Sequence, residues 1–287
     1  MASLAPSTRK AYSAAWSAFE SFCTANRLLA LPASASTVAE WLAWRSHAGG
    51  GGSARRDVAA VRDMHILRRL PDPTTDSWLQ RVVQGALRLA ASTRPARAPR
   101  DALPRHVVDA LLTLVPASGT QSASSALALR DAAVISLGLS LMRRAGELAA
   151  LRIDDIHVHD GQQAVVCIRR SKTDQLGRGL DLPVTGPPVT LLTRWLQVRH
   201  LLVPRSPHLF VSTTGAPLTT AAIGSIVKRA AALAGLEGSF SAHSLRIGGA
   251  SAALAAGSSL SQIQAIGGWS SDSVLRYLRP ALATVVA

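Results

Sequence analysis

Tyrosine, lysine, methionine and cysteine are scarce in this chain of 287 residues, and the scarcity of cysteine argues against a protein held together by disulfides. Cys23 and Cys167 predict two buried, reduced thiols, which argues against a disulfide framework or a cysteine zinc site and indicates a reducing compartment. No segment reaches the roughly 18 unbroken apolar residues of a membrane span. The first residues lack a charged region followed by an apolar one, so we expect no secretory signal.

Acidic residues are also few, and the resulting positive charge is the strongest bulk signal. Lys and Arg number 31 against 17 Asp and Glu, which gives a formal net charge of +14. This excess predicts binding to polyanions, chiefly DNA or RNA, with an affinity that falls as salt rises. The charge is spread over the chain and not along one amphipathic helix, which disfavours an anionic membrane surface. Only 3 of the 31 are lysines, so each lysine needs an explanation.

Hydrophobic periodicity predicts a mainly α-helical protein of two domains with a small antiparallel β-sheet in the second. Four amphipathic helices near 7–26, 35–47, 53–69 and 75–91 indicate a compact helical domain over residues 1–92. We expect its tryptophans, Trp16, Trp41, Trp44 and Trp78, to lie in the core. Residues 93–104 hold three prolines and three arginines, typical of a stiff basic linker that either follows a DNA backbone or is a solvated tether.

The remaining residues, 105–287, predict a mixed domain. Helices are expected near 105–115, 125–140 and 144–151. Strands at 164–168 and 180–184 flank a polar loop rich in turn formers at 171–177. Further helices follow near 189–201, 220–235, 243–257, 259–266 and 271–278.

Four side chains in the last fifth of the sequence fit around a phosphate. His243 and Arg246 are three residues apart, so a helix places both on one face. Trp269 adds an indole donor, and Tyr277 is one of only two tyrosines. Cleaving a phosphodiester without a metal needs a nucleophile, cations on the nonbridging oxygens and a proton donor for the leaving oxygen. A guanidinium meets the second need because it binds phosphate oxygens bidentately.

Three other patterns are discounted. His157 and His159 share one face of a strand, but no third or fourth metal ligand is evident. Gly49 to Gly52 lack the Lys-Ser/Thr of a phosphate-binding loop. Asp154 and Asp155 are better explained as caps than as a two-carboxylate metal site. We therefore expect neither a metal nor a cofactor.

Taken together, the motifs resemble those of the tyrosine recombinases, also called phage-integrase-type site-specific recombinases. The matching elements, in order, are Arg144-Ala145-Gly146-Glu147-Leu148, Lys172 in a β-hairpin, His243-Ser244-Leu245-Arg246, Trp269 and Tyr277. The opening Ser7-Thr8-Arg9-Lys10-Ala11-Tyr12 is similar to the start of that family's core-binding domain. The resemblance implies a four-helix SAM-like core-binding domain over 1–92 and an α+β catalytic domain over 105–287. The run 269–280 is more similar to recombinases of eukaryotic mobile elements.

The resemblance also implies how the phosphate is attacked and held. Tyr277 takes the place of the nucleophile, and Arg144 and Arg246 take the places of the clamp on the scissile phosphate. Arg144 is chosen over its neighbour Arg143 because it lies three residues before Glu147, which supports the site structurally.

The remaining roles concern proton transfer and hydrogen bonding. Lys172 takes the place of the general acid that protonates the leaving oxygen. His243 assists proton transfer and binds the phosphate. Trp269 replaces a commoner histidine and can only donate a hydrogen bond and pack. Ten residues follow Tyr277, and whether it serves its own active site or a neighbour's stays open.

The resulting hypothesis is a site-specific DNA recombinase or integrase that cuts and rejoins DNA through a 3′-phosphotyrosine without metal or ATP. Its partner is double-stranded DNA with a specific recombination site, and the expected assembly is a homotetramer on DNA, with a monomer as an alternative when free. We expect it inside the cell with DNA, in the nucleus of a eukaryote or the cytoplasm and nucleoid of a bacterium. Two alternatives are a non-catalytic DNA-binding protein of this fold and a type IB topoisomerase- or resolvase-like enzyme. The DNA-binding candidates are Arg9, Lys10, Arg55, Arg56, Arg94, Arg97 and Arg100.

Overall fold

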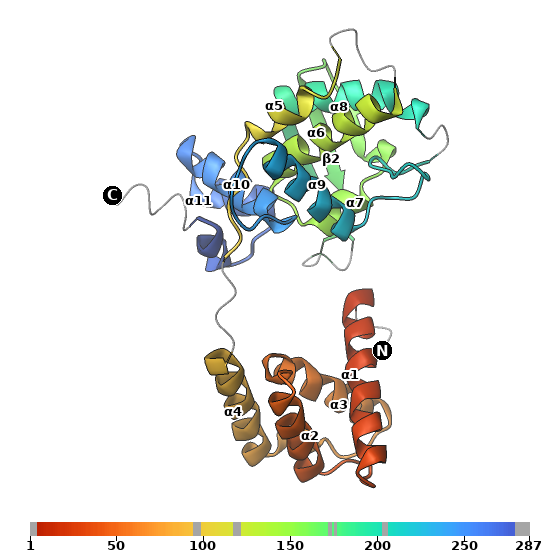
Figure 1. The fold of residues 1–287 in the computed structure, drawn as a ribbon, viewed down its shortest axis with the longest axis vertical. Helices are drawn as coiled ribbons and strands as arrows, with labels where there is room; N and C mark the ends of the chain where they lie inside the picture. The colour runs from red at the N-terminus through yellow and green to blue at the C-terminus, as the bar shows by residue number, and fades with distance from the viewer. Residues whose placement is uncertain are drawn as a thin grey trace. The chain divides into compact units, whose positions relative to one another are not determined.

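The computed structural model describes residues 5–93, 99–116, 122–171, 174, 177–202 and 206–278. The chain divides into two compact units, Met1–Arg97 and Ala98–Ala287 (Figure 1). Each unit has a hydrophobic core of its own. The predicted fold class, mainly α with a small antiparallel sheet, is confirmed.

The first unit is built from four helices, in the order expected. They are α1 (Pro6–Ala25), α2 (Ala35–His47), α3 (Ala54–Leu67) and α4 (Ser77–Thr93), with short 3₁₀ turns η1 (Gly51–Ser53) and η2 (Pro73–Thr75). Phe19 and Trp41 are fully buried at its centre, with ring centroids 5.0 Å apart. Buried aromatic rings of this size dominate the stability of a small core.

Two tryptophans contradict the expected core assignment. Trp44 and Trp78 are 56% and 49% exposed, whereas Trp16 and Trp41 are buried. Three residues turn a helix by roughly 300°, so Trp44 is displaced by roughly 60° from Trp41 toward the edge of α2. There its ring lies beside that of Phe22 at the margin of the core, with ring centroids 5.6 Å apart.

Beside the core of the first unit lies a buried histidine that ties α3 to the segment before α2. His65 is fully buried, and its Nδ1 donates to Val61 O at 2.8 Å, the carbonyl four residues earlier. Its Nε2 accepts the backbone N–H of Ala33 at 2.9 Å. Both ring nitrogens of this buried histidine are therefore hydrogen bonded.

Among its described residues, the second unit surrounds one central α-helix with six others, three short 3₁₀ turns and a small sheet. The elements are α5 (Val107–Leu112), α6 (Ala123–Leu141), α7 (Ala145–Ala150), η3 (Ile153–Asp155), β1 (Ile156–Val158), β2 (Gln163–Ile168), β3 (Leu180–Thr185), α8 (Pro187–Val198), η4 (Arg199–Leu201), α9 (Thr220–Leu233), α10 (His243–Ala255), α11 (Leu260–Gly267) and η5 (Asp272–Val274). Residues 275–278 continue from η5 as a helical turn.

Strand β1 is an addition to the two predicted strands. The sheet has the antiparallel order β1-β2-β3, with Val166 of the central strand opposite Ile156 and Leu182. Only three residues long, β1 exposes two of them, His157 and Val158. A segment so short and exposed carries no alternating pattern, which is why the sequence did not reveal it.

Helix α6 is the centre of the second unit. By length and composition alone it could cross a membrane, but 83% of its apolar window is buried inside the unit, as in the core helix of a globular protein. Helix α10 packs closely against its C-terminal end, because Gly249 touches the backbone of Leu139 and a Cβ there would overlap the Leu139 carbonyl oxygen. This close approach places the start of α10 beside the turn that follows α6.

Part of the expected linker is hydrogen bonded to the second unit. The backbone N–H of Asp101 donates to Ser239 O at 3.2 Å, and that of Leu103 donates to Ser244 O at 3.2 Å. The guanidinium of Arg100 donates to the hydroxyl of Ser239. Residues 100–103 therefore run along the segment that leads into α10.

Candidate active site

The site begins where α6 ends in a left-handed residue. Met142 has a φ of 52°, which closes α6 and reverses the chain into Arg144, the N-cap of α7. Arg144 Nη1 pairs with Glu147 Oε1 at 3.1 Å, and its backbone N–H donates to Glu147 Oε2 at 3.3 Å. The buried Glu147 thus fixes both the main chain and the guanidinium of Arg144, whose side chain stays 35% exposed.

Arg246 on α10 lies under this turn. It is 2% exposed, and its Nη1 donates to Met142 O at 2.5 Å and to Gly267 O at 2.9 Å. Burial lowers the pKa of Arg246 to about 10, while its electrostatic interaction with Tyr277 acts in the opposite direction. The guanidinium remains charged at neutral pH and joins the ends of two helices.

Three rings gather around Arg246. Its Cζ lies 4.0 Å from the ring centroid of Trp269 and 5.4 Å from that of Tyr277. Tyr277 packs edge-on against Trp269 at 4.9 Å and lies 4.9 Å from the ring of His243. The structure therefore brings together all four C-terminal residues singled out in the sequence, from α10, the turn after α11 and the helical residues 275–278.

Buried donors in this cluster are ready for an anion. Trp269 Nε1 and Arg246 Nε have no hydrogen-bond acceptor among the residues that the structure describes. A buried donor without an acceptor is costly, so such groups suit a ligand that brings its own oxygens. Together with the half-exposed guanidinium of Arg144, they can bind the nonbridging oxygens of a phosphate diester.

The neutral form of His243 is favoured by its surroundings. Desolvation lowers the pKa of His243 below its ordinary value of 6.5, and the charges of Arg246 and Arg144 lower it further. We predict that its imidazole titrates below 6.5 in the folded protein, so that it can accept a proton at pH 7. NMR titration of the ring protons, assigned with His243→Gln, measures this value.

A charge replacement gives the matched comparison for this prediction. Arg144→Met should raise the pKa of His243, since one repelling cation is removed. His47→Gln, at an exposed residue of α2, should leave it unchanged. A pKa of His243 at or above 6.5 in the unaltered protein contradicts the prediction.

Lys172 lies outside the described residues, in the connection between β2 and β3. The described part of that connection is held by Asp174, whose carboxylate accepts the backbone N–H of Gly179 at 2.9 Å and of Arg178 at 3.2 Å. These bonds, the one from Gly179 first, lower the pKa of Asp174. The carboxylate of Asp174 thus holds the backbone of Arg178 and Gly179 in place.

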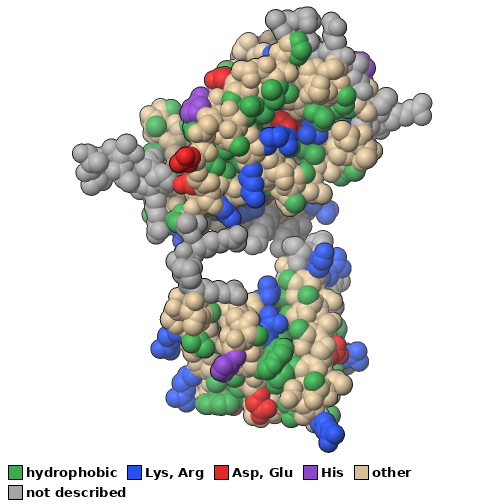
Figure 2. Space-filling view, viewed as in Figure 1, with side chains coloured by type: hydrophobic (Ala, Val, Ile, Leu, Met, Phe, Trp, Pro, Cys, Tyr) green, Lys and Arg blue, Asp and Glu red, His purple; other side chains and the backbone are tan. Residues whose placement is uncertain are grey.

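The remaining DNA-binding candidates separate into free and engaged side chains. Arg9, Lys10 and Arg55 are exposed on the first unit, and Lys and Arg side chains are visible over both units in Figure 2. Arg56 pairs with Asp57 at 3.3 Å. Arg100 is bonded to Ser239 within the second unit. Arg94 and Arg97 lie outside the described residues.

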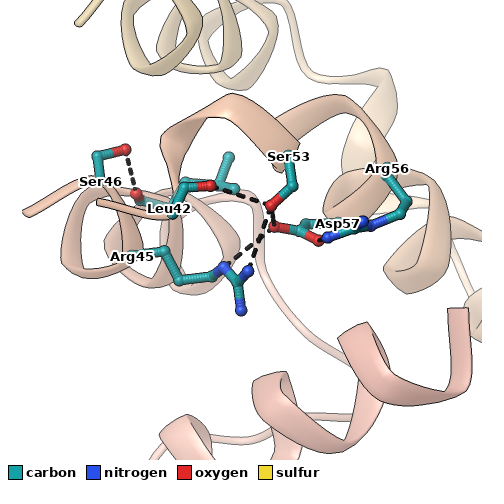
Figure 3. Close-up of polar contacts among 7 residues, drawn as sticks. Leu42, Arg45, Ser46, Ser53, Arg56 and Asp57 are labelled. Atoms are coloured by element: carbon teal, nitrogen blue, oxygen red, sulfur yellow. Dashed lines mark hydrogen bonds and ion pairs between the residues drawn. The ribbon is translucent and has the colours of Figure 1, made fainter. Parts of the chain in front are cut away.

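Asp57 organises the start of α3 (Figure 3). The carboxylate is fully buried, accepts the hydroxyl of Ser53 at 2.7 Å and pairs with Arg45 Nε at 3.0 Å. Acidic groups are stabilised in the first turn of a helix by its dipole. The network ties α2, η1 and α3 together and thereby sets where Arg55 and Arg56 emerge; sequence reasoning did not find it.

The described residues contain no candidate metal site. Across the ranges that the structure describes, no group of three His, Cys, Asp or Glu side chains is arranged to hold a metal ion.

Comparison with known proteins identifies the same class. The family model described as "Phage integrase family" matches residues 103–281. The Integrase/recombinase xerD homolog of Selenomonas ruminantium is 27% identical over 264 residues, covering 88% of this chain and 74% of that protein. Tyrosine recombinase XerC of Alcanivorax borkumensis is 37% identical over 155 residues, covering 52% of this chain and 48% of its own length.

Solved structures share the fold. XerH site-specific recombinase bound to difH substrate superposes with a TM-score of 0.57 at 21% identity, covering 88% of this chain and 69% of that one. A lambda integrase fragment, solved as a dimer bound to a COC′ core site, gives 0.56 at 18% identity over 96% of this chain and 89% of that one.

The fold and the site define a site-specific tyrosine recombinase, an enzyme class that transfers DNA strands. The chain belongs to the phage integrase family. Such an enzyme works inside the cell in association with DNA. The two sequence relatives named above come from bacteria, and the similarity to eukaryotic mobile elements stays a prediction.

Proposed function

We propose that this chain cuts and rejoins DNA at a specific site through a covalent 3′-phosphotyrosine formed on Tyr277. The observation that carries the proposal is the packing of Tyr277 against His243, Arg246 and Trp269, a cluster of one phenol with cationic and neutral donors. A phenol is a weak nucleophile at neutral pH unless a base removes its proton or cations stabilise its anion, and this cluster supplies both.

The chemical step balances without a metal or ATP. Tyr277 Oη attacks phosphorus, the bond from phosphorus to the 5′-oxygen breaks, and the tyrosine loses its proton to a base, for which His243 is suited. Arg144 and Arg246 neutralise the nonbridging oxygens, Trp269 donates to one of them, and Lys172 protonates the leaving 5′-oxygen. Because the phosphotyrosine keeps the energy of the ester bond, the 5′-hydroxyl of a second strand can reverse the reaction.

Partners follow from this chemistry. The substrate is double-stranded DNA with a specific recombination site, supported by the net charge of +14 and by fold neighbours solved with DNA, such as XerH with difH. Exchange of two strand pairs needs four cleavages, so we propose a homotetramer on DNA, with exposed Arg9, Lys10 and Arg55 among its phosphate contacts. The cellular site is the nucleus of a eukaryote or the nucleoid of a bacterium.

Covalent capture from a pool of nicked duplexes with randomised arms tests the proposal. We expect a protein–DNA adduct that survives denaturation, forms in the presence of a chelator and maps by mass spectrometry to Tyr277, with the DNA joined through its 3′-phosphate. Binding without any adduct would assign the chain to non-catalytic DNA-binding proteins. Relaxation of supercoiled DNA without a preferred sequence would favour a topoisomerase-like enzyme.

A further inference from the structure

The two consecutive arginines that follow α6, Arg143 and Arg144, differ in their exposure to solvent. Arg144 keeps its side chain 35% exposed and paired with Glu147, whereas Arg143 is only 2% exposed. Within the described part of the chain, no carboxylate lies within ion-pair distance of Arg143, and its Nε has no acceptor. A buried charge with so little compensation costs several kcal/mol, so ordinary packing does not account for it.

The guanidinium of Arg143 reaches the C-terminal end of α11. Its Nη2 donates to Ala265 O at 3.3 Å. It also lies directly on Gly268, the left-handed residue that ends α11 with a φ of 68°, because a Cβ on Gly268 would overlap Arg143 Nη1. The last carbonyls of a helix carry the negative end of its dipole, which favours a cation at this position.

Arg246 binds the neighbouring carbonyl of the same helix end. It donates to Gly267 O at 2.9 Å, two residues from the Arg143 contact. The ring of Trp269 then folds back over Gly267, where a Cβ would overlap it, and continues to Tyr277. The turn that carries Trp269 is therefore held by two guanidiniums. One belongs to Arg143, which follows the end of α6, and the other to Arg246 in the first turn of α10.

We propose that Arg143 is a positioning residue, whose buried guanidinium holds the end of α11 and the following turn so that Trp269 meets the phosphate and Tyr277. The proposal rests on the proposed function, since Trp269 is argued there to donate to the phosphate. Desolvation lowers the pKa of the Arg143 guanidinium, and the charge of Glu147 acts in the opposite direction.

The test uses the full chain labelled with 5-fluorotryptophan. Only Trp195 and Trp269 are tryptophans of the second unit, and Trp195 is fully buried with its Nε1 bonded to Leu209 O at 2.9 Å, which makes it an internal control. In Arg143→Met we expect the fluorine resonance of Trp269, assigned with Trp269→Phe, to shift or broaden while that of Trp195 stays in place. Single-turnover cleavage should fall about 100-fold, the cost of a misplacement near 1 Å, with DNA affinity within about threefold.

Companion variants separate positioning from general support. Arg143→Lys keeps the charge and should restore part of the cleavage rate. Arg194→Met, a half-buried arginine of α8, should change neither readout. Because an apolar replacement of a buried charge is often neutral for stability, the thermal midpoint of Arg143→Met should not fall in proportion to cleavage.

Each contrary result has a distinct meaning. An unchanged Trp269 resonance, or an equal shift of Trp195, overturns the proposal. A shifted Trp269 in a protein whose unaltered form never cleaves DNA leaves positioning intact and removes the proposed function. If Arg143→Met does not fold, Arg143→Lys replaces it in the test, and there the Trp269 resonance must still shift while that of Trp195 stays in place.

Discussion

Replacing Tyr277 by phenylalanine removes the covalent protein–DNA adduct, with a fall in cleavage of about four orders of magnitude or more. The phenyl ring keeps the packing against Trp269 and His243, whose centroids lie 4.9 Å away, so the site should keep its shape. DNA affinity is therefore expected within about threefold of the unaltered protein. The measurement is the adduct on a denaturing gel, beside equilibrium binding to the same nicked duplex.

The chain offers a matched control for this change. Its only other tyrosine is Tyr12 on α1 in the first unit, so Tyr12→Phe removes the same hydroxyl elsewhere and should retain cleavage. If Tyr277→Phe still forms the adduct, or if Tyr12→Phe abolishes it, the nucleophile has been wrongly assigned.

The second large effect is expected for Arg246, because it serves both the phosphate and the fold. In Arg246→Met, loss of the guanidinium should slow cleavage by about three orders of magnitude, the scale seen when a preorganised donor is removed. The carbonyls of Met142 and Gly267 also lose their shared donor, which should lower the free energy of unfolding by about 1–3 kcal/mol. Single-turnover kinetics and denaturant unfolding measure the two effects.

Arg246→Lys distinguishes charge from geometry. An ammonium keeps the positive charge but lacks the planar fork that spans two carbonyls and a phosphate. We expect cleavage to stay at least about tenfold below normal in this variant, with Arg194→Met as the control for removal of another arginine from the same unit. Full activity in Arg246→Lys would show that charge alone suffices.

Most helices were predictable because their apolar residues recur with helical spacing. The expected helix at 35–47 coincides with α2, and those at 220–235 and 243–257 match α9 and α10 to within two residues at their ends. Ser34 and Thr219 accept backbone N–H groups at the helix starts, as capping residues do. Strand β1 gave no signal, because pairing with β2 and not its own composition makes it a strand.

The site shows the same division between local and tertiary information. Motif order predicted a cluster of His243, Arg246, Trp269 and Tyr277, and the structure brings them together, while their catalytic roles stay predictions. No local pattern distinguishes Arg143 from Arg144 in burial, since only the position of α11 decides which guanidinium turns inward. The partners of the buried Asp57 and His65 were hidden for the same reason, because Arg45 lies on α2 and Ala33 in the segment before it.

Tyr277 packs against His243, Arg246 and Trp269 of its own chain, and this has a consequence for mixed assemblies. On the proposed mechanism, a subunit that supplies its own nucleophile to its own phosphate clamp would be active or inactive independently of its neighbours. A defective copy would leave uncut the one strand on which it is bound, and a neighbour with an intact tyrosine could not replace it. Mixing Tyr277→Phe with Arg246→Met subunits would then leave both strands uncut, because neither subunit could complement the other. A damaged copy would lower activity only in proportion to its share of the subunits.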